Sequence, residues 1–350
     1  MISGATQNNL VAAIADACRA GLDLDELRGR LLPRIRRAVP VDALWWAVAD
    51  PVTLLFNRAE REGIPAETGP YFVANEFLEN DVNKWTELAR DRNGVRTLYE
   101  ATGGEPESSA RYRDIFKPLG LGDEMRAVLR ADGECWGYVC MHREGPGGFL
   151  REEVGFVQRI APHLADGFRL ATLIGSTRVD DAPPPGVVVL GEDGSRAATN
   201  AAGERWLDEL GADPERNELP LELLAVAARL QGVDGTEGRS ARLRVRTRAG
   251  RWAVLHASWL GEPPSRSVAV IIEQAAPSEV LPVLLPAYGL TQQERRVTAL
   301  ICRGLSTIEI AAQLRVTTNT IQDHLKSIFT KTGVRSRREL VATLLKQQYH

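Results

Sequence analysis

Between Thr318 and Thr332, polar and apolar side chains recur at a spacing that predicts a two-sided helix. The apolar side holds Ile321, Leu325 and Ile328. The residues expected on the opposite side are Asn319, Gln322, Asp323 and Lys326. An amide can make two hydrogen bonds to adenine, a lysine reaches the acceptors of guanine, and a carboxylate accepts from the amino group of cytosine. The pattern therefore predicts a helix whose outer face reads base edges in a DNA groove.

A second set of polar side chains flanks this outer face and suits contacts to phosphate. Its members are Thr318, Thr320, His324, Ser327, Lys331 and Arg337. Phosphate contacts fix the register of a protein on DNA, whereas base contacts select the sequence. The alternative is that the segment belongs to a helical packing module with one solvated face.

Hydroxyl and carboxylate side chains three residues apart mark helix starts in this part of the chain. In a capping box the hydroxyl accepts from a free backbone N–H, and the glutamate reaches back to the cap residue. The capping residues are Thr291 with Glu294, Ser306 with Glu309, Ser336 with Glu339, and Thr317 alone. They predict four helices, at 291–303, 307–314, 318–332 and 337–347. Two residues, Arg315 and Val316, separate the second helix from Thr317, a turn length typical of helix-turn-helix units.

Charge is distributed unevenly along the chain. Residues 288–350 carry ten basic and four acidic side chains, whereas the remaining residues carry 33 basic and 42 acidic ones. A basic module on an acidic body indicates a polyanion partner for the module. A basic surface without a partner is the alternative interpretation.

Four strings in this module resemble the LuxR-type DNA-binding domain, which is shared with NarL-like and FixJ-like regulators. They lie at 290–297, 304–311, 320–326 and 331–337. The resemblance implies that the third helix enters the major groove of double-stranded DNA. Positions that match base-facing residues are Gln322, Asp323 and Lys326, and those that match framework or phosphate positions are Thr320, His324 and Lys331. Thr317 replaces the usual serine, and Asp323 departs from the usual apolar or basic residue.

The fourth helix of that family often forms a dimer contact. In this chain Leu340, Val341 and Leu344 give the helix at 337–347 more apolar surface than its own domain obviously needs. They are candidates for the contact of a homodimer, in which the same patch serves both subunits. The alternative is that they bury inside the domain or against the preceding segment.

Two proline-containing stretches, 180–186 and 276–288, are expected to be linkers. They separate segments 1–179, 187–275 and 289–350. The first resembles a GAF domain in its bounding helices, its hairpin at Asp132-Gly133 and its long exit helix. The second shows the order β-β-α-α-β-β-β and resembles a PAS domain. We therefore expect an α+β multidomain chain: GAF-like and PAS-like α/β sensory domains, then an all-α four-helix LuxR-type helix-turn-helix domain.

Alternation along predicted strands assigns side chains to sheet faces. It places Trp136, Tyr138, Cys140 and His142 on one face and directs Cys135 and Cys140 to opposite faces. A candidate ligand pocket is formed by Trp45, Trp136, Tyr138 and His142, and the alternative is plain core. In the second segment, Leu243, Val245 and Thr247 alternate with Arg242, Arg244, Arg246 and Arg248, which predicts a strand with one face in water.

Several function classes find no support in the sequence. It contains no Walker A, G-x-G-x-x-G, G-x-S-x-G or H-E-x-x-H string, so we expect no enzyme. The five histidines show no ligand spacing, so no metal is expected, and no cofactor is expected beyond an unidentified small-molecule effector. No apolar run is long enough to span a membrane, and no secretory signal precedes the first helix. The four scattered cysteines favour a cytoplasmic protein without a membrane partner.

Together the resemblances imply a one-component transcriptional regulator in which the two N-terminal domains sense a small molecule or a partner. Double-stranded DNA and a second copy of the chain are the expected partners, with RNA polymerase as a further candidate. One alternative is a constitutive DNA binder whose N-terminal domains are protein-interaction modules. A second alternative makes the GAF-like segment an enzyme, although no nucleophile and base pair supports it.

Overall fold

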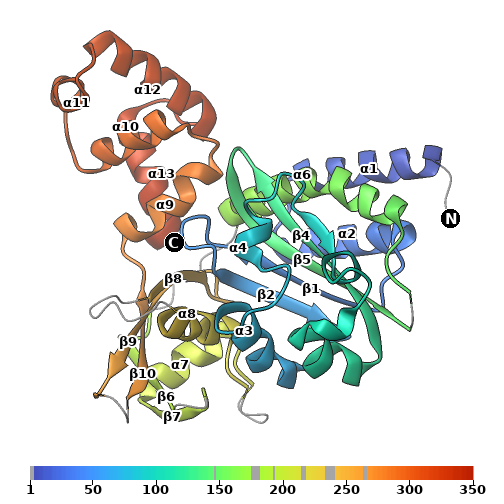
Figure 1. Cartoon of the computed structure of the whole chain (residues 1–350). Helices are drawn as coiled ribbons and strands as arrows, with labels where there is room; N and C mark the ends of the chain where they lie inside the picture. The colour runs from blue at the N-terminus through green and yellow to red at the C-terminus, as the bar shows by residue number, and fades with distance from the viewer. Residues whose placement is uncertain are drawn as a thin grey trace.

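The chain forms two α/β units and a helical C-terminal module, which follow one another from blue to red in Figure 1. The computed structural model describes residues 4–145, 147–174, 182–191, 194–213, 218–232, 241–262 and 266–349, with the backbone alone for 345–349. Residues 180 and 181 of the first expected linker lie outside the described residues. Within the described ranges, no helix has the length and apolar character needed to cross a membrane.

The N-terminal unit is built on an antiparallel sheet of order β2-β1-β5-β4-β3. Its strands are β1 (Ala43–Ala49), β2 (Phe56–Glu62), β3 (Val95–Thr97), β4 (Leu121–Ala131) and β5 (Glu134–Glu144). One face packs against α1 (Gly4–Arg19), α2 (Leu24–Ala38) and α6 (Arg151–Leu173). The short helices of this unit are α3 (Gly69–Phe77), α4 (Trp85–Leu88) and α5 (Leu98–Ala101), and α4 packs on the opposite face.

The second unit repeats the strand order of the first. Its antiparallel sheet runs β7-β6-β10-β9-β8. The elements are β6 (Gly186–Leu190), β7 (Arg196–Thr199), α7 (Ala201–Leu210), α8 (Leu221–Gly232), β8 (Ala241–Arg246), β9 (Trp252–Leu260) and β10 (Ser267–Gln274). Asn200 caps α7 by accepting from the backbone N–H of Gly203 at 2.7 Å. The order β-β-α-α-β-β-β expected for this segment is therefore present.

The two α/β units share a continuous interface. A single buried cluster contains Phe56 and Tyr138 of the first sheet together with Leu223 and Val226 of α8. Strand β2, an edge strand, lies beside β8 and α8, and α3 packs against α8. The two units are therefore packed against each other through apolar side chains, in addition to being joined by the chain between them.

The arginine-rich face of β8 is not the water-exposed face that its alternation predicts. Arg244 is buried and its Nη1 lies 2.9 Å from Oδ2 of Asp50, at the end of β1. Arg242 forms an ion pair with Glu279, and Arg246 donates to the carbonyls of Thr172 and Ile174 at the end of α6. The alternation itself is present, but Arg244 and Arg246 meet the neighbouring unit, whereas Arg242 stays partly exposed and Arg248 is exposed as predicted.

A β-bulge in β5 overturns the expected grouping of aromatic side chains. Leu129 of β4 pairs with Gly137, whereas Arg130 pairs with Cys135, so Trp136 is an extra residue without a ladder partner. The bulge turns Trp136 to the helix-covered face with Trp46, while Tyr138 and Cys140 remain on the other face. Trp136 therefore cannot share a pocket with Trp45, Tyr138 and His142. For the same reason Cys135 and Cys140 lie on the same side of the sheet, not on opposite sides.

The second expected linker is a helix. Residues Pro277–Ala287 form α9, which begins with Pro277 at a position that needs no backbone N–H. Val280, Val283 and Leu284 are fully buried against Trp252 and Val254 of β9. Because α9 also contacts α6, α10 and α13, it connects both α/β units to the C-terminal module.

The C-terminal module contains α10 (Gln292–Cys302), α11 (Thr307–Leu314), α12 (Thr318–Thr332) and α13 (Arg337–Tyr349). These helices enclose a separate core that includes Val297, Ile310, Ile321 and Leu340. In Figure 1 the module projects away from the two α/β units, with α11 and α12 at its far end.

Candidate functional site

Helix α12 begins and ends at residues suited to those positions. Thr317 accepts from the backbone N–H of Thr320 at 3.2 Å, and Gly333 closes the helix in the left-handed conformation at φ 70°. Between them, Ile321, Leu325 and Ile328 are buried in the core of the module. The inner face of the helix is therefore fixed by packing, which orients the outer face rigidly.

All four side chains predicted to face bases are exposed. They are Asn319, Gln322, Asp323 and Lys326. Nζ of Lys326 lies 3.3 Å from Oδ1 of Asp323, and both side chains are more than 70% exposed, at 80% and 76%. Such an exposed pair contributes little to stability, so either side chain can exchange its partner for a base edge. The face is available and carries both donors and acceptors.

The flanking polar side chains divide into two groups. Thr318 is exposed, and Thr320 and His324 of the same helix are half-buried. Arg337, the first residue of α13, is also half-buried. Ser327 and Lys331 instead turn toward α10. Oγ of Ser327 donates to Oε1 of Glu294 at 2.6 Å, and Nζ of Lys331 lies 2.7 Å from Oε2. These two residues position α12 within its own module, a role that the sequence pattern did not indicate.

Glu294 joins the start of α10 to the end of α12. One of its oxygens accepts from the backbone N–H of Thr291 at 2.7 Å as part of the capping box. Burial acts to raise the pKa of this carboxyl, but the hydrogen bonds from Lys331, Ser327 and Thr291 outweigh burial and lower the pKa from 4.5 to about 2. The cap glutamate is thus ionised at neutral pH and holds α12 through Ser327 and Lys331.

The remaining helix starts of the module carry the expected cap residues. Ser306 and Glu309 form a reciprocal capping box, with Ser306 N donating to Glu309 at 2.7 Å. Ser336 accepts from the backbone N–H of Glu339 at 3.1 Å, whereas the Glu339 carboxylate reaches Arg335 N instead of Ser336 N. Arg315, at the turn between α11 and α12, adopts a left-handed conformation at φ 55°.

The candidate dimer contact on α13 requires a correction. Leu340 and Leu344 are 0% and 1% exposed and belong to the core of the module. Val341 is half-buried against the same core. Leu340 and Leu344 therefore take the alternative role, burial inside the domain, because α10 and α9 cover the helix.

The module is attached to the N-terminal unit by polar contacts that the sequence did not indicate. Nη1 of Arg295 on α10 lies 2.6 Å from Oε1 of Glu134, the first residue of β5. Arg169 of α6 donates to the carbonyl of Ala287, the last residue of α9, at 2.8 Å. Both contacts join residues more than 100 positions apart, which explains why local pattern could not reveal them.

The aromatic residues of the candidate ligand pocket pack against each other. Trp85 lies 4.5 Å from Tyr138 and 6.0 Å from Trp45, measured between ring centroids, and Phe56 contacts both Trp45 and Tyr138. Tyr138 also donates to the carbonyl of Leu54 at 2.9 Å. This arrangement favours the alternative interpretation, a packed core, for Trp45 and Tyr138.

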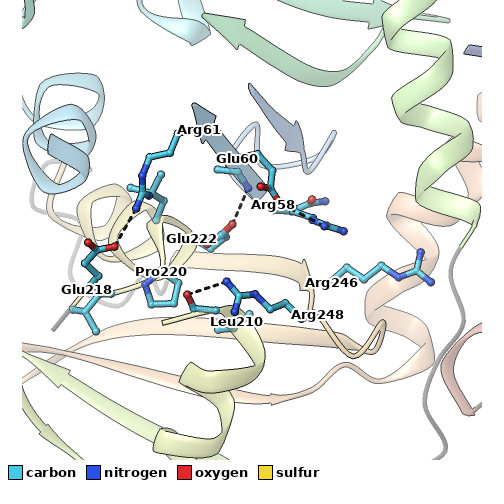
Figure 2. A pocket seen from close by; sticks show the side chains of 14 residues that line it. Arg58, Glu60, Arg61, Leu210, Glu218, Pro220, Glu222, Arg246 and Arg248 are labelled. Carbon is cyan, nitrogen blue, oxygen red and sulfur yellow. Dashed lines mark hydrogen bonds and ion pairs between the residues drawn. The ribbon is translucent and has the colours of Figure 1, made fainter. Parts of the chain in front are cut away.

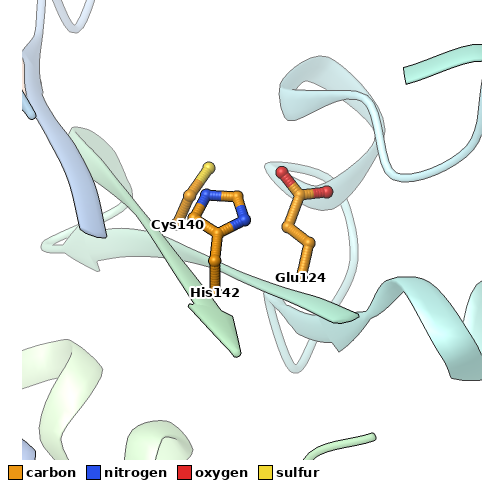
Figure 3. A group of neighbouring side chains, drawn as sticks. All are labelled: Glu124, Cys140 and His142. Carbon is orange, nitrogen blue, oxygen red and sulfur yellow. The ribbon is translucent and has the colours of Figure 1, made fainter. Parts of the chain in front are cut away.

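His142 belongs to a buried group that includes Glu124 and Cys140, shown in Figure 3. Glu124 lies directly opposite His142 in the β4–β5 ladder, and potential ligand atoms of the three residues lie within 4.8 Å of one another. Arg111 and Arg126 already neutralise Glu124, with N to O distances of 2.8 and 2.9 Å. Two neighbouring guanidinium groups oppose a further cation.

The protonation state of the Cys140 thiol points the same way, whereas a neutral His142 does not oppose a metal. Burial raises the pKa of the Cys140 thiol well above its usual range and lowers that of His142 to about 4. A metal requires a deprotonated thiol, which burial disfavours here. The group is therefore best described as a buried charge network around Glu124.

Helices α11 and α12, their short turn and the exposed outer face of α12 define a helix-turn-helix module joined to two α/β units. Residues 289–344 match the family model described as bacterial regulatory proteins of the luxR family, and residues 24–166 match the GAF domain model. The chain belongs to the LuxR family of bacterial regulatory proteins, and its N-terminal unit is a GAF domain.

Individual relatives match over short parts of the chain, 51 to 58 residues long. The spore germination protein GerE of Bacillus subtilis is 35% identical over 57 residues, which cover 16% of this chain and 77% of that protein. A probable HTH-type transcriptional regulator, GfsR of Streptomyces halstedii, is 40% identical over 52 residues, which cover 15% of this chain and 21% of that protein. The chain matches between 21% and 27% of the length of the first four curated relatives.

Among solved structures, the GAF domain of a phosphoenolpyruvate-protein phosphotransferase from Coxiella burnetii is similar to part of the chain. The identity is 18% and the TM-score is 0.34, over 47% of this chain and 93% of that domain.

Proposed function

We propose that this chain is a transcriptional regulator that reads operator DNA with α12 under the control of its N-terminal units. The observation that carries the proposal is the two-sided burial of α12: Ile321 and Ile328 are fully buried, whereas Gln322 is exposed. A helix held in this way presents fixed side chains to the major groove. The family to which the C-terminal module belongs supports the same role.

Within this proposal the outer residues have distinct tasks. Gln322 and Lys326 make the main base contacts, and Asn319 and Asp323 complete the reading face. The phosphate contacts are made by the half-buried Thr320, His324 and Arg337 and by the exposed Thr318. Lys331 has donors beyond the one used by Glu294, so it contacts phosphate while it holds the helix in place.

We infer that two copies of the chain bind DNA together, because paired recognition helices would then lie about 34 Å apart, one helical turn of DNA. The dimer surface does not include Leu340 or Leu344, since both are buried. Analytical ultracentrifugation with and without operator DNA tests this point. RNA polymerase remains a candidate further partner.

Control by the N-terminal units acts through α9 and its contacts. The second unit, which we take as PAS-like from its element order and its five-stranded antiparallel sheet, holds α9 against β9. A ligand or partner that favours one arrangement of α6 and α9 would shift the population able to place two modules on DNA. Limited proteolysis of the segment 275–291 with and without candidate effectors tests the coupling, and unchanged cleavage in every case contradicts it.

A second candidate function, constitutive DNA binding with N-terminal protein-interaction modules, is favoured by one observation. The proposed reading face of α12 is exposed to solvent. Equal operator affinity of the purified chain with and without metabolite extract would support this function over effector control. Enzyme activity is no part of the proposal, and turnover of a small molecule by the purified chain would contradict it.

The experiment that tests the main proposal selects DNA from a random pool with the full chain. Enrichment of a defined site, lost in a chain with Gln322→Ala and Lys326→Ala, is the expected result. Enrichment of the same site by that variant would overturn the assignment of α12 as the reading helix.

A further inference from the structure

A polar cavity lies between the two α/β units. Its volume is about 340 Å³, and it is lined by β2 on one side and by α8 and the end of β8 on the other (Figure 2). Four arginines border it, Arg58 and Arg61 from the first unit and Arg246 and Arg248 from the second. A smaller adjoining cavity shares Arg58, Arg246 and Arg248 and extends to the end of α6. Small-molecule sites favour such positions between domains.

The arginines of β8 and the residues just after it differ in how their charge is neutralised. Arg242 pairs with Glu279, and Arg244 pairs with the buried Asp50. Arg246 and Arg248, which border the cavity, donate to backbone carbonyls: Arg246 to Thr172, Ile174 and Gly250, and Arg248 to Gly211 at 3.3 Å. Among the described residues, no carboxylate lies within ion-pair distance of either Arg246 or Arg248.

On the opposite wall of the cavity, the two arginines of β2 each have a carboxylate partner. Arg58 is bound by Asp25 at 2.8 Å, and Arg61 by Glu218 at 3.0 Å. Burial, together with the nearby charge of Arg58, lowers the pKa of Arg246 from 12.5 to about 10, as expected for a cation without a compensating anion. Arg246, the last residue of β8, and Arg248, two residues after it, therefore lack a carboxylate counter-charge. Their side chains extend in opposite directions, and that of Arg248 runs toward Gly211 on the wall of the larger cavity (Figure 2).

The acidic side chains of the cavity restrict what can fill it. Glu60, Glu218 and Glu222 also line the wall, and Glu222 is buried, with one oxygen accepting from Ala59 N at 3.0 Å. Figure 2 shows Glu222 on the cavity wall between Arg61 and Arg58. An anion without a donor group would be repelled at that end. A hydroxyl or ammonium group on the same molecule would instead donate to these carboxyl oxygens.

We propose that this cavity binds a small carboxylate or phosphate compound that also carries a hydroxyl or ammonium group, with Arg248 binding the anionic group. Guanidinium groups suit both anions, because their donors match two oxygens of either one. This proposal names the effector class for the regulator proposed above, and its coupling to DNA rests on that function. The binding site itself does not depend on it.

The site is connected to the DNA-binding module through Arg246. Its donors hold the carbonyls of Thr172 and Ile174 at the end of α6, and Leu173 packs on the cluster that buries α9. A ligand that extends from Arg248 into the adjoining cavity takes donors from Arg246 and weakens these bonds to the end of α6. The module is then affected through α9, which contacts α10 and α13.

Calorimetric titration of the full chain with inorganic phosphate and, separately, with lactate tests the proposal. Sodium chloride keeps the ionic strength constant, because salt alone screens exposed charges. We expect the chain to bind at least one probe and the variant Arg248→Gln to bind it at least about tenfold more weakly, the loss of one charge-assisted hydrogen bond. Binding of phosphate alone or of lactate alone identifies the anionic group that the site prefers.

Two variants serve as controls. Arg242→Gln lies on the same strand outside the cavity, and Lys326→Gln removes a cation from the basic module; both should bind as the unaltered chain does. Arg248 is exposed, so its replacement should leave the fold intact, which circular dichroism verifies. No binding of either probe, or equal weakening by Arg248→Gln and Lys326→Gln, overturns the proposal. Because no DNA is present, failure of operator binding would leave this result untouched.

Discussion

Nη1 of Arg295, on the first helix of the helix-turn-helix module, lies 2.6 Å from Oε1 of Glu134 at the tip of the β4–β5 hairpin. Each side chain is 26% exposed, so the pair lies at the border of the contact and not inside a core. The relationship matters because it joins the GAF domain directly to the module that carries α12. Together with the bond from Arg169 to Ala287, it fixes the orientation of the module in this arrangement.

Breaking this pair should loosen the module without unfolding the chain. Replacement Glu134→Gln removes the charge, and a half-exposed pair contributes at most about 1 kcal/mol. We expect faster proteolysis within residues 275–291 and an unchanged melting temperature of the N-terminal unit. The exposed Glu144, at the other end of the same strand, provides the control Glu144→Gln. Identical cleavage of all three chains would show that the pair does not restrain the module.

The carboxyl of Glu294 should make the stability of the module depend on pH. Its pKa is about 2 in the folded chain and 4.5 as the ordinary value, so its contribution is present above about pH 4.5 and is lost as pH falls toward 2. At neutral pH this corresponds to roughly 3 kcal/mol at most. The difference in unfolding free energy between the unaltered chain and Glu294→Gln, measured by urea at several pH values, should shrink on acidification. A difference that stays constant down to pH 2.5 would contradict this role.

The contribution of Glu222 to stability should depend on pH in the opposite direction. Burial raises its pKa from 4.5 to about 7, helped by Glu60 and opposed by the hydrogen bond from Ala59 and the charge of Arg58. The protonated form is favoured in the folded chain, so its stabilising contribution is present below about pH 4.5 and is lost as pH rises through 7. Replacement Glu222→Gln keeps an acceptor for Ala59 and should stabilise the chain at pH 8 by about 1–3 kcal/mol, with little effect at pH 5. Equal effects at the two pH values would refute the assignment.

The buried pair of Asp50 and Arg244 should be essential to the interface between the two α/β units. Asp50→Asn keeps an acceptor for the backbone N–H of Val52 but leaves Arg244 buried without a counter-charge. Removal of one partner of such a pair typically costs about 3–5 kcal/mol. Addition of Arg244→Met to Asp50→Asn should recover part of the loss, measured by urea unfolding. Simple additivity of the two replacements would show that the pair is not coupled.

Much of the fold follows from local sequence pattern. The helix at 201–210 could be predicted because Asn200 is a strong cap. The strand at 252–260 could be predicted because it is a short, mostly apolar run. The cap residues of the C-terminal module are equally local, since each hydrogen bond spans three or four residues. The exposed outer face of α12 follows from helical periodicity alone.

The features that could not be predicted depend on residues far apart in the chain. The bulge at Trp136 is set by the register of β5 against β4, which no single strand reveals. Helix α9 forms despite Pro282 and Pro286 because burial of Val280 and Val283 stabilises it. The bond from Lys331 to Glu294 joins residues 37 positions apart, so Lys331 could be assigned to phosphate but not to its own module.

The central claim is that the outer face of α12 selects a DNA sequence. The most direct test measures two affinities by fluorescence anisotropy at fixed salt: that for the selected site and that for a scrambled duplex. The proteins compared are the unaltered chain, Lys326→Ala and Lys331→Ala. We expect Lys326→Ala to lose about 1–3 kcal/mol for the selected site and little for the scrambled one, whereas Lys331→Ala weakens both duplexes alike. The account is contradicted if the ratio of the two affinities in Lys326→Ala, and in the double variant Gln322→Ala with Lys326→Ala, equals the ratio in the unaltered chain.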